Sequence, residues 1–96
     1  MPAYVISEVE FLDAAAVEHY RELARRSIEQ HGGRYLVRGA TPRASEGEWP
    51  AQRRTVIVEF PDMTAARGWY ASPEYAEALA FRDRALTRRL VFVDGA

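Results

Sequence analysis

The segment TVIVEF, residues 55–60, decides the fold class of this 96-residue chain. It consists almost entirely of β-branched and aromatic residues, which favour an extended strand. Side chains alternate between the two faces of a strand. The residues at even positions are all apolar, whereas the odd positions include Thr55 and Glu59. We therefore expect a strand with its apolar face on helices and a mixed second face.

Three other segments have the composition of strands, namely residues 3–11, 34–39 and 90–94. Residues 40–53 contain two prolines, one glycine and a tryptophan. This stretch is too long for a tight hairpin and is rich in turn-forming residues. We expect it to form a flap between the second and third strands.

Two helical segments lie between these strands. Residues 13–31 begin with an aspartate that can cap a helix and end before two glycines that can stop it. Residues 62–86 also begin with an aspartate, and Ser72 and Pro73 interrupt them. A serine cap followed by proline is a helix start, so the second helix is expected to break there.

The order strand, helix, strand, strand, helix, strand predicts a ferredoxin-like α+β fold, with residues 1–96 as a single domain. Right-handed crossovers place both helices on one face of a four-stranded antiparallel sheet. The other face would be an exposed apolar patch on a monomer. We therefore expect a homodimer in which two protomers pack sheet to sheet.

Strand periodicity predicts which charged side chains lie on the uncovered face of the sheet. With Tyr35 and Val37 directed to the helices, Glu8, Arg38 and Glu59 would share the uncovered face with aliphatic residues. An arginine buried between carboxylates forms either a structural ion-pair network or an anion-binding pocket. Both interpretations stay open.

Arg82 interrupts an apolar stripe of the last helix. Its side chain could extend along the stripe to water, or direct its guanidinium at a carboxylate of the protein or of a ligand. Several other arginines are expected on the solvated surface, at positions 21, 25, 26, 84 and 88.

Aromatic residues add candidate ligand contacts. Trp69, Tyr70 and Tyr75 cluster around the helix break, and Trp49 lies in the flap. Tryptophan and tyrosine line both pockets and interfaces, since they bury large areas and keep a polar group. A tryptophan in a loop rich in glycine and proline is expected to cover a site. His19, near the edge of the polar face of the first helix, is a candidate base.

The composition excludes several kinds of chemistry. All 13 basic side chains are arginine, and there is no cysteine, so lysine Schiff bases and thiolate chemistry are absent. Two histidines cannot build a three-histidine metal site, and we expect neither a metal nor a cofactor. A net charge of −1 argues against nucleic acid and membrane partners. The absence of a basic, apolar leader predicts a cytoplasmic protein.

The motifs GGRYLVRGA, EGEW, RTVIVEFPDM and WYASPEY, in this order, resemble the family called domain of unknown function 1330. The resemblance implies a ferredoxin-like protomer of the dimeric α/β-barrel superfamily, whose two sheets close into a barrel. That superfamily includes cofactor-free monooxygenases, lactone isomerases and haem enzymes, and no reaction is assigned to the family itself. The residues that match its pattern are Arg38, Trp49, Glu59, Phe60, Pro61, Trp69, Tyr70, Ser72, Pro73, Glu74, Tyr75 and Arg82.

Two functions fit these features. The first is a protein that binds a small anionic or aromatic molecule beside the sheet, with or without catalysis and without a cofactor. Glu59, Glu8 and His19 are then the candidate bases. The alternative is a non-catalytic dimeric module in which the same charges form ion pairs at the interface. The ligand-binding candidates of the first hypothesis are Arg38, Trp49, Glu59, Trp69, Tyr70, Tyr75 and Arg82.

Overall fold

The computed structural model describes residues 1–96 and has four strands and three helices. None of the helices is long and apolar enough to cross a bilayer. The elements in chain order are β1 (Ala3–Phe11), α1 (Ala14–Gln30), β2 (Arg34–Ala40), β3 (Arg54–Phe60), α2 (Met63–Tyr70), α3 (Pro73–Ala85) and β4 (Leu86–Asp94).

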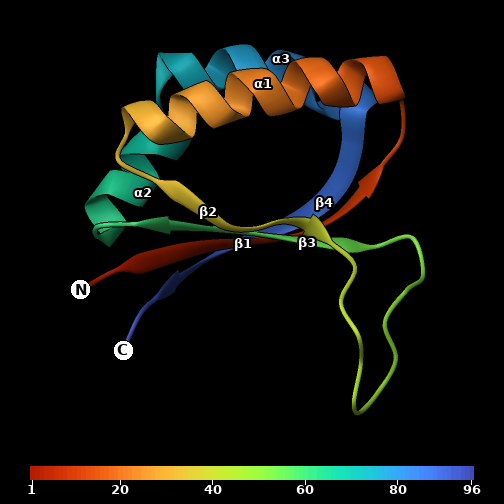
Figure 1. The fold of residues 1–96 in the computed structure, drawn as a ribbon. Helices are drawn as coiled ribbons and strands as arrows, with labels where there is room; N and C mark the ends of the chain where they lie inside the picture. Colours follow the sequence, from red (N-terminus) through yellow and green to blue (C-terminus); the bar gives the residue numbers. More distant parts are fainter.

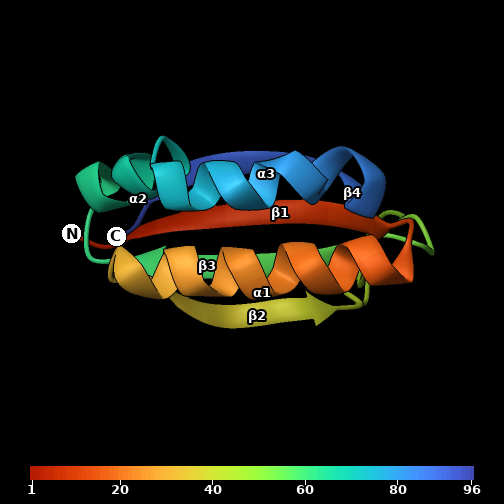
Figure 2. The same ribbon diagram turned by 90° about the horizontal axis from the view of Figure 1, so that it is seen from above.

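The strands form one antiparallel sheet in the order β2-β3-β1-β4. All helices lie on one face of this sheet (Figure 1). Seen from above, α1 lies on the side of β2 and β3, and α3 lies on the side of β1 and β4 (Figure 2). The loop between β2 and β3 extends on the side of the sheet away from the helices (Figure 1). The ferredoxin-like fold predicted from the sequence is confirmed.

The helices begin at the predicted capping residues. The Asp13 carboxylate accepts hydrogen bonds from backbone N–H groups of the first turn of α1, and Asp62 accepts one from Ala65 at 2.7 Å. At the break between α2 and α3, the Ser72 hydroxyl accepts from the Tyr75 N–H at 3.1 Å. The second predicted helix is therefore divided into α2 and α3 where the sequence places the break.

A β-bulge in β2 changes which residues face the helices. Tyr35 lies opposite Val58, but Val37 lies opposite Ile57, so two steps along β2 match one step along β3. The extra residue reverses the alternation beyond it. Val37 therefore joins the uncovered face and Arg38 turns to the helix side, where it lines a cavity. The sequence-based placement of Val37 and Arg38 is wrong, because regular alternation does not anticipate a bulge.

The last strand begins earlier than predicted. β4 starts at Leu86 rather than at Leu90, and its first residues rise toward α3 (Figure 1). Leu86, Arg88, Leu90 and Phe92 are more buried than their neighbours and share the helix side of the strand. Arg88, predicted on the solvated surface, is therefore directed into the interior.

The uncovered face of the sheet carries an apolar row that crosses all four strands. Val37 lies opposite Ile57, Ile57 opposite Ile6, and Ile6 opposite Val91. Val91 is 51% exposed. We refer to these four residues as the apolar row.

Ion pairs lie on both sides of the apolar row. Glu8 contacts Arg89 at 2.6 Å and Arg53 at 3.7 Å, and Glu59 contacts Arg34 at 2.8 Å. Both carboxylates are thus paired with arginines of the same chain. The two glutamates thus pair with Arg34, Arg53 and Arg89, and the predicted network around Arg38 does not form.

Candidate ligand-binding cleft

A small, mainly apolar cavity lies between the helices and the sheet. It has a volume of about 50 Å³, and we refer to it as the inner cavity. The residues that line it are Val5, Ser7, Val9, Phe11, Tyr20, Arg21, Ala24, Ile28, Tyr35, Arg38, Val56, Val58, Trp69, Leu86, Arg88 and Leu90. Twelve of the sixteen are hydrophobic, and none is acidic.

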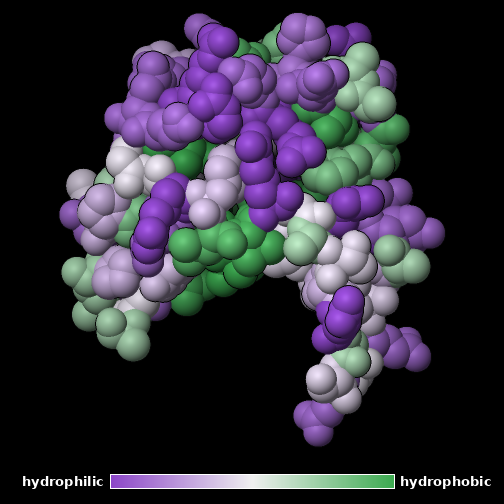
Figure 3. Space-filling view, viewed as in Figure 1, coloured by the Kyte–Doolittle hydropathy of each residue, from purple (hydrophilic) through white to green (hydrophobic).

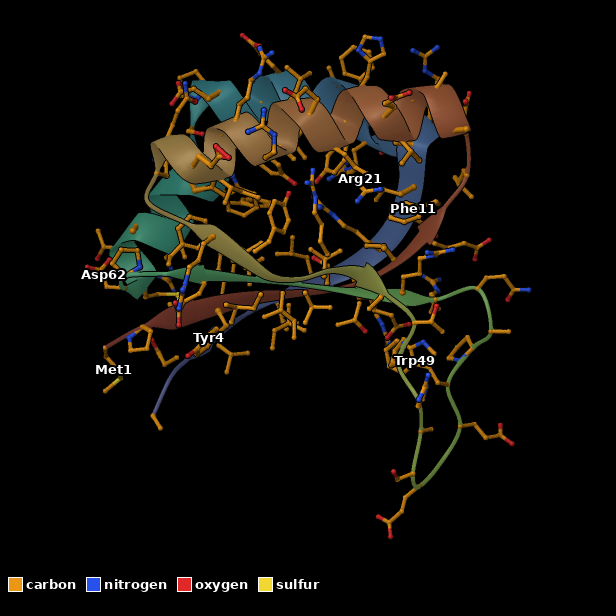
Figure 4. All side chains as sticks on the ribbon, in the orientation of Figure 1. Met1, Tyr4, Phe11, Arg21, Trp49 and Asp62 are labelled. Carbon is orange, nitrogen blue, oxygen red and sulfur yellow. The ribbon has the colours of Figure 1, made fainter.

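A wider surface depression of about 610 Å³, the outer hollow, lies beside the inner cavity. Phe11, Arg21 and Arg38 line both spaces, and we refer to this boundary as the mouth. Figure 4 shows Arg21 below α1 and Phe11 near the end of β1, both directed into the space above the sheet. In the space-filling view, hydrophilic residues extend across this opening with hydrophobic surface beside them (Figure 3).

The mouth carries two arginines that make no ion pair. The Arg38 guanidinium lies 4.6 Å from the Tyr35 ring centroid and donates a long hydrogen bond of 3.5 Å to the Arg21 carbonyl. The Arg21 guanidinium lies 5.8 Å from the Phe11 ring centroid. Aromatic faces stabilise these cations without neutralising them. The mouth therefore carries two cations, and Glu18 is the one acidic residue that lines the outer hollow beside them.

A third arginine lies at the β4 side of the inner cavity. Arg88 donates hydrogen bonds of 2.7 Å to the hydroxyls of Tyr20 and Tyr75, whose oxygens lie 2.6 Å apart. We refer to these three residues as the tyrosine–arginine cluster. Burial raises the pKa of Tyr20 and of Tyr75 above the ordinary tyrosine value. Both hydroxyls therefore stay protonated at neutral pH and act as hydrogen-bond donors rather than bases.

Trp69 forms part of the cavity wall and is fixed in place by its surroundings. It is buried, its Nε1–H donates to the Ser27 hydroxyl at 2.9 Å, and Ser27 donates to the Ala24 carbonyl at 2.8 Å. Its ring centroid lies 4.2 Å from that of Tyr75. A residue held from two sides gives the cavity a rigid aromatic wall.

The candidate bases lie outside the inner cavity. Glu8 and Glu59 lie on the uncovered face of the sheet in their ion pairs. His19 is exposed on α1, and its ring stacks on Phe81 with a centroid distance of 5.2 Å. None of the three reaches a ligand bound between the helices and the sheet.

Three ligand-binding candidates also lie elsewhere. Trp49 is at the root of the flap below the sheet (Figure 4), where its Nε1–H donates to the Arg53 carbonyl at 2.9 Å. Tyr70 and Arg82 line a separate surface groove between α3 and β4. Arg82 contacts the neighbouring Asp83 at 3.2 Å. Of the predicted ligand contacts, the inner cavity brings together Arg38 and Trp69. Tyr75 does not line the cavity, but its hydroxyl contacts that of Tyr20, which does.

Sequence reasoning missed five residues of this cavity that carry polar groups, namely Ser7, Tyr20, Arg21, Tyr35 and Arg88. The sequence contains a signal for the inward position of Arg88, because Arg88 continues the alternation of Leu90 and Phe92 toward the start of β4. No three metal-ligating side chains converge in the structure, so we assign no residue to a metal.

The four-stranded antiparallel sheet with three helices on one face defines a ferredoxin-like α+β protein. The chain belongs to the family described as domain of unknown function (DUF1330), whose sequence model matches residues 2–96. This match confirms the resemblance of the sequence motifs.

Solved structures with the same fold are distant in sequence. A protein of unknown function from Rhodopseudomonas palustris is 20% identical, with a TM-score of 0.78 over 99% of this chain and 82% of the other. SnoaB from Streptomyces nogalater, a cofactor-independent oxygenase, is 14% identical, with a TM-score of 0.70 over 99% and 93%. No functionally curated protein matches the sequence. These likenesses establish the fold alone.

Proposed function

We propose that this protein binds a small anionic molecule with an aromatic or apolar body in the inner cavity and its mouth. The observation that carries the proposal is the set of arginines on the cavity wall. Arg21, Arg38 and Arg88 all line the cavity, none contacts a carboxylate, and no acidic residue lines it. An anion is the partner that these residues lack.

The energetics favour an anion at the mouth. Two unit charges 4 Å apart interact with about 4 kcal/mol near a protein surface, against about 1 kcal/mol in bulk water. The planar guanidinium can also bind a carboxylate through two parallel hydrogen bonds. The apolar and aromatic lining, which includes Trp69 and Val58, suits a flat hydrophobic body.

We assign no catalytic residue. The carboxylates and imidazoles named as candidate bases lie outside the cavity, and the tyrosines at its inner end hold their protons. SnoaB shows that a protein of this fold acts on a substrate without a cofactor. That likeness supports a small-molecule role here, and the geometry of this chain supports binding.

We also propose that the uncovered face pairs with a second copy of the chain. The apolar row would lie at the centre, and the flanking ion pairs would neutralise the remaining charges of the interface. The dimeric module considered from the sequence thus corresponds to the uncovered face of the sheet. Ligand binding would use the face that the helices cover. The two roles do not compete for the same residues.

Titration with benzoate tests the ligand proposal. In a Trp49→Phe background the remaining tryptophan, Trp69, reports on the inner cavity. We expect Arg38→Ala to weaken benzoate binding about tenfold, since an ionic hydrogen bond is lost. Arg43→Ala, in the exposed flap, removes the same charge and should leave the affinity unchanged. Equal affinity in wild type and in the Arg21→Ala/Arg38→Ala double variant would contradict the proposal.

A further inference from the structure

Ser7 is the one polar, uncharged, non-aromatic residue in the floor of the inner cavity. It is 5% exposed. Its hydroxyl makes no hydrogen bond within the protein. Every fully enclosed side-chain oxygen in the molecule has a hydrogen-bond partner, so the Ser7 hydroxyl is not fully enclosed. The Ser7 hydroxyl therefore faces the open space of the cavity that it lines.

The sheet register places Ser7 at the centre of this floor. On the central strand β1 it lies opposite Val56 on one side and Leu90 on the other, both of which line the cavity. Arg88 lies two residues from Leu90 on the same face of β4, so it is a diagonal neighbour of Ser7. Ser7 thus lies between the mouth and the tyrosine–arginine cluster.

The tyrosine–arginine cluster offers a hydroxyl proton to the same space. Tyr20 and Tyr75 each accept one N–H from Arg88, and one hydroxyl proton lies between their two oxygens. Two hydroxyls carry two protons, so the second proton has no acceptor in the protein. Tyr20 lines the cavity and Tyr75 does not. When Tyr75 donates to Tyr20, the Tyr20 O–H has no acceptor in the protein, and Tyr20 is the member of the pair that lines the cavity.

Arg88 makes this donor stronger. Its guanidinium is only partly exposed and has neutral hydroxyls as its partners, so its charge is not compensated. Hydrogen bonds from a cation to the phenol oxygens polarise their O–H bonds. An oxygen with partial or full negative charge is the acceptor that such a group prefers.

We propose that Ser7 and Tyr20 bind a second oxygen of the ligand, and that the ligand is an aromatic carboxylate bearing a hydroxyl or oxo group distant from the carboxylate. The carboxylate binds Arg21 and Arg38 from the outer hollow, and the ring passes through the mouth. Only the far end of the ring enters the inner cavity of about 50 Å³, where the second oxygen accepts from the two hydroxyls. This inference rests on the proposed function, because it names the ligand class of the same cavity. It adds a polar inner end that the arginine mouth alone does not require.

A pair of probes separates the two proposals. Benzoate carries the carboxylate alone, whereas 4-hydroxybenzoate carries an additional oxygen at the far end of the ring. We expect the wild-type protein to bind 4-hydroxybenzoate about tenfold more tightly than benzoate, as one or two good hydrogen bonds provide. Trp69 fluorescence in the Trp49→Phe background, with calorimetry as a second method, measures both dissociation constants.

Ser7→Ala and Tyr20→Phe each remove one hydroxyl and retain the shape of the site. Each should remove most of the preference for 4-hydroxybenzoate and change benzoate affinity less than twofold. Tyr4→Phe is the matched control, since it removes a hydroxyl from the opposite face of β1 (Figure 4). Thermal unfolding shows whether each variant is folded. Ser7→Thr, which keeps the hydroxyl and should keep the preference for 4-hydroxybenzoate, gives a second test if Ser7→Ala fails to fold.

The outcomes are distinct. A preference that disappears in both variants and persists in the control supports the inference. Equal wild-type affinity for the two probes, or a preference that survives both substitutions, overturns the inference and leaves the proposed function intact. Failure of wild-type protein to bind either probe overturns both.

Discussion

A charge placed in the apolar row should separate the proposed dimer into monomers. Val91 is the clearest position, because it is 51% exposed in the single chain and belongs to the row that crosses the sheet. In a two-fold interface each substitution occurs twice. Val91→Arg therefore introduces two like charges at the centre of the contact.

The expected change in the dimer dissociation constant follows from the exposed fraction of the Val91 side chain. Burying a whole valine side chain contributes about 1.5–3 kcal/mol, so half of one from each copy contributes about 1.5–3 kcal/mol per dimer. Losing that term alone raises the dissociation constant about 10- to 150-fold. Desolvation and repulsion of the two guanidinium groups add to the loss. We expect Val91→Arg to be monomeric at low micromolar concentrations where the wild type is dimeric.

Sedimentation velocity measures this directly. Ala80→Arg is the matched control, because it adds the same charge to the exposed side of α3 and should remain dimeric. Arg38→Ala should also remain dimeric, since the bulge in β2 directs Arg38 to the helix side. A wild-type monomer, or a Val91→Arg dimer of unchanged affinity, would refute the sheet-to-sheet arrangement.

Two further predictions concern stability. A Cβ at Gly33 would lie 2.6 Å from a Phe60 ring atom, so Gly33→Ala should lower the free energy of unfolding by about 1–3 kcal/mol in urea. Gly68 lies in α2 with open space around it, so Gly68→Ala should raise the free energy of unfolding by about 0.5–1 kcal/mol. Similar effects of the two substitutions would contradict the reasoning. Buried Tyr75 has a raised pKa, so above about pH 10 the unfolded chain loses a proton that the folded chain retains, and stability falls. Melting temperatures between about pH 9 and 11 should fall less steeply in Tyr75→Phe than in the wild type, and parallel curves would count against a buried hydroxyl.

Most of the fold was predictable because its signals are local. The caps at Asp13, Asp62 and Ser72 are short-range features, and each holds a helix start in the structure. The strand at residues 55–60 alternates as its sequence suggests, with Val58 and Phe60 buried. Such patterns depend on neighbours in the chain and need no knowledge of tertiary contacts.

The site was predicted only in part, because its composition depends on register. The bulge in β2 moved Arg38 from the uncovered face to the cavity, and the early start of β4 brought Arg88 inside. Tyr20 and Tyr75 meet across 55 residues of sequence, a distance at which no spacing rule operates. An arginine is compatible with either face of an edge strand, so its type alone could not decide its position.

The distribution of arginine partners explains why a nearly neutral chain can still select an anion. On the uncovered face the charges compensate one another, as Glu8 does with Arg89 and Glu59 with Arg34. On the helix side the cavity arginines have only aromatic rings, hydroxyls and a carbonyl as partners. The net charge of −1 therefore hides a local excess of positive charge in a confined, mainly apolar space. A field confined in this way attracts a small anion and offers no extended basic surface for a polyanion, which is why the cavity points to a small molecule rather than to a nucleic acid.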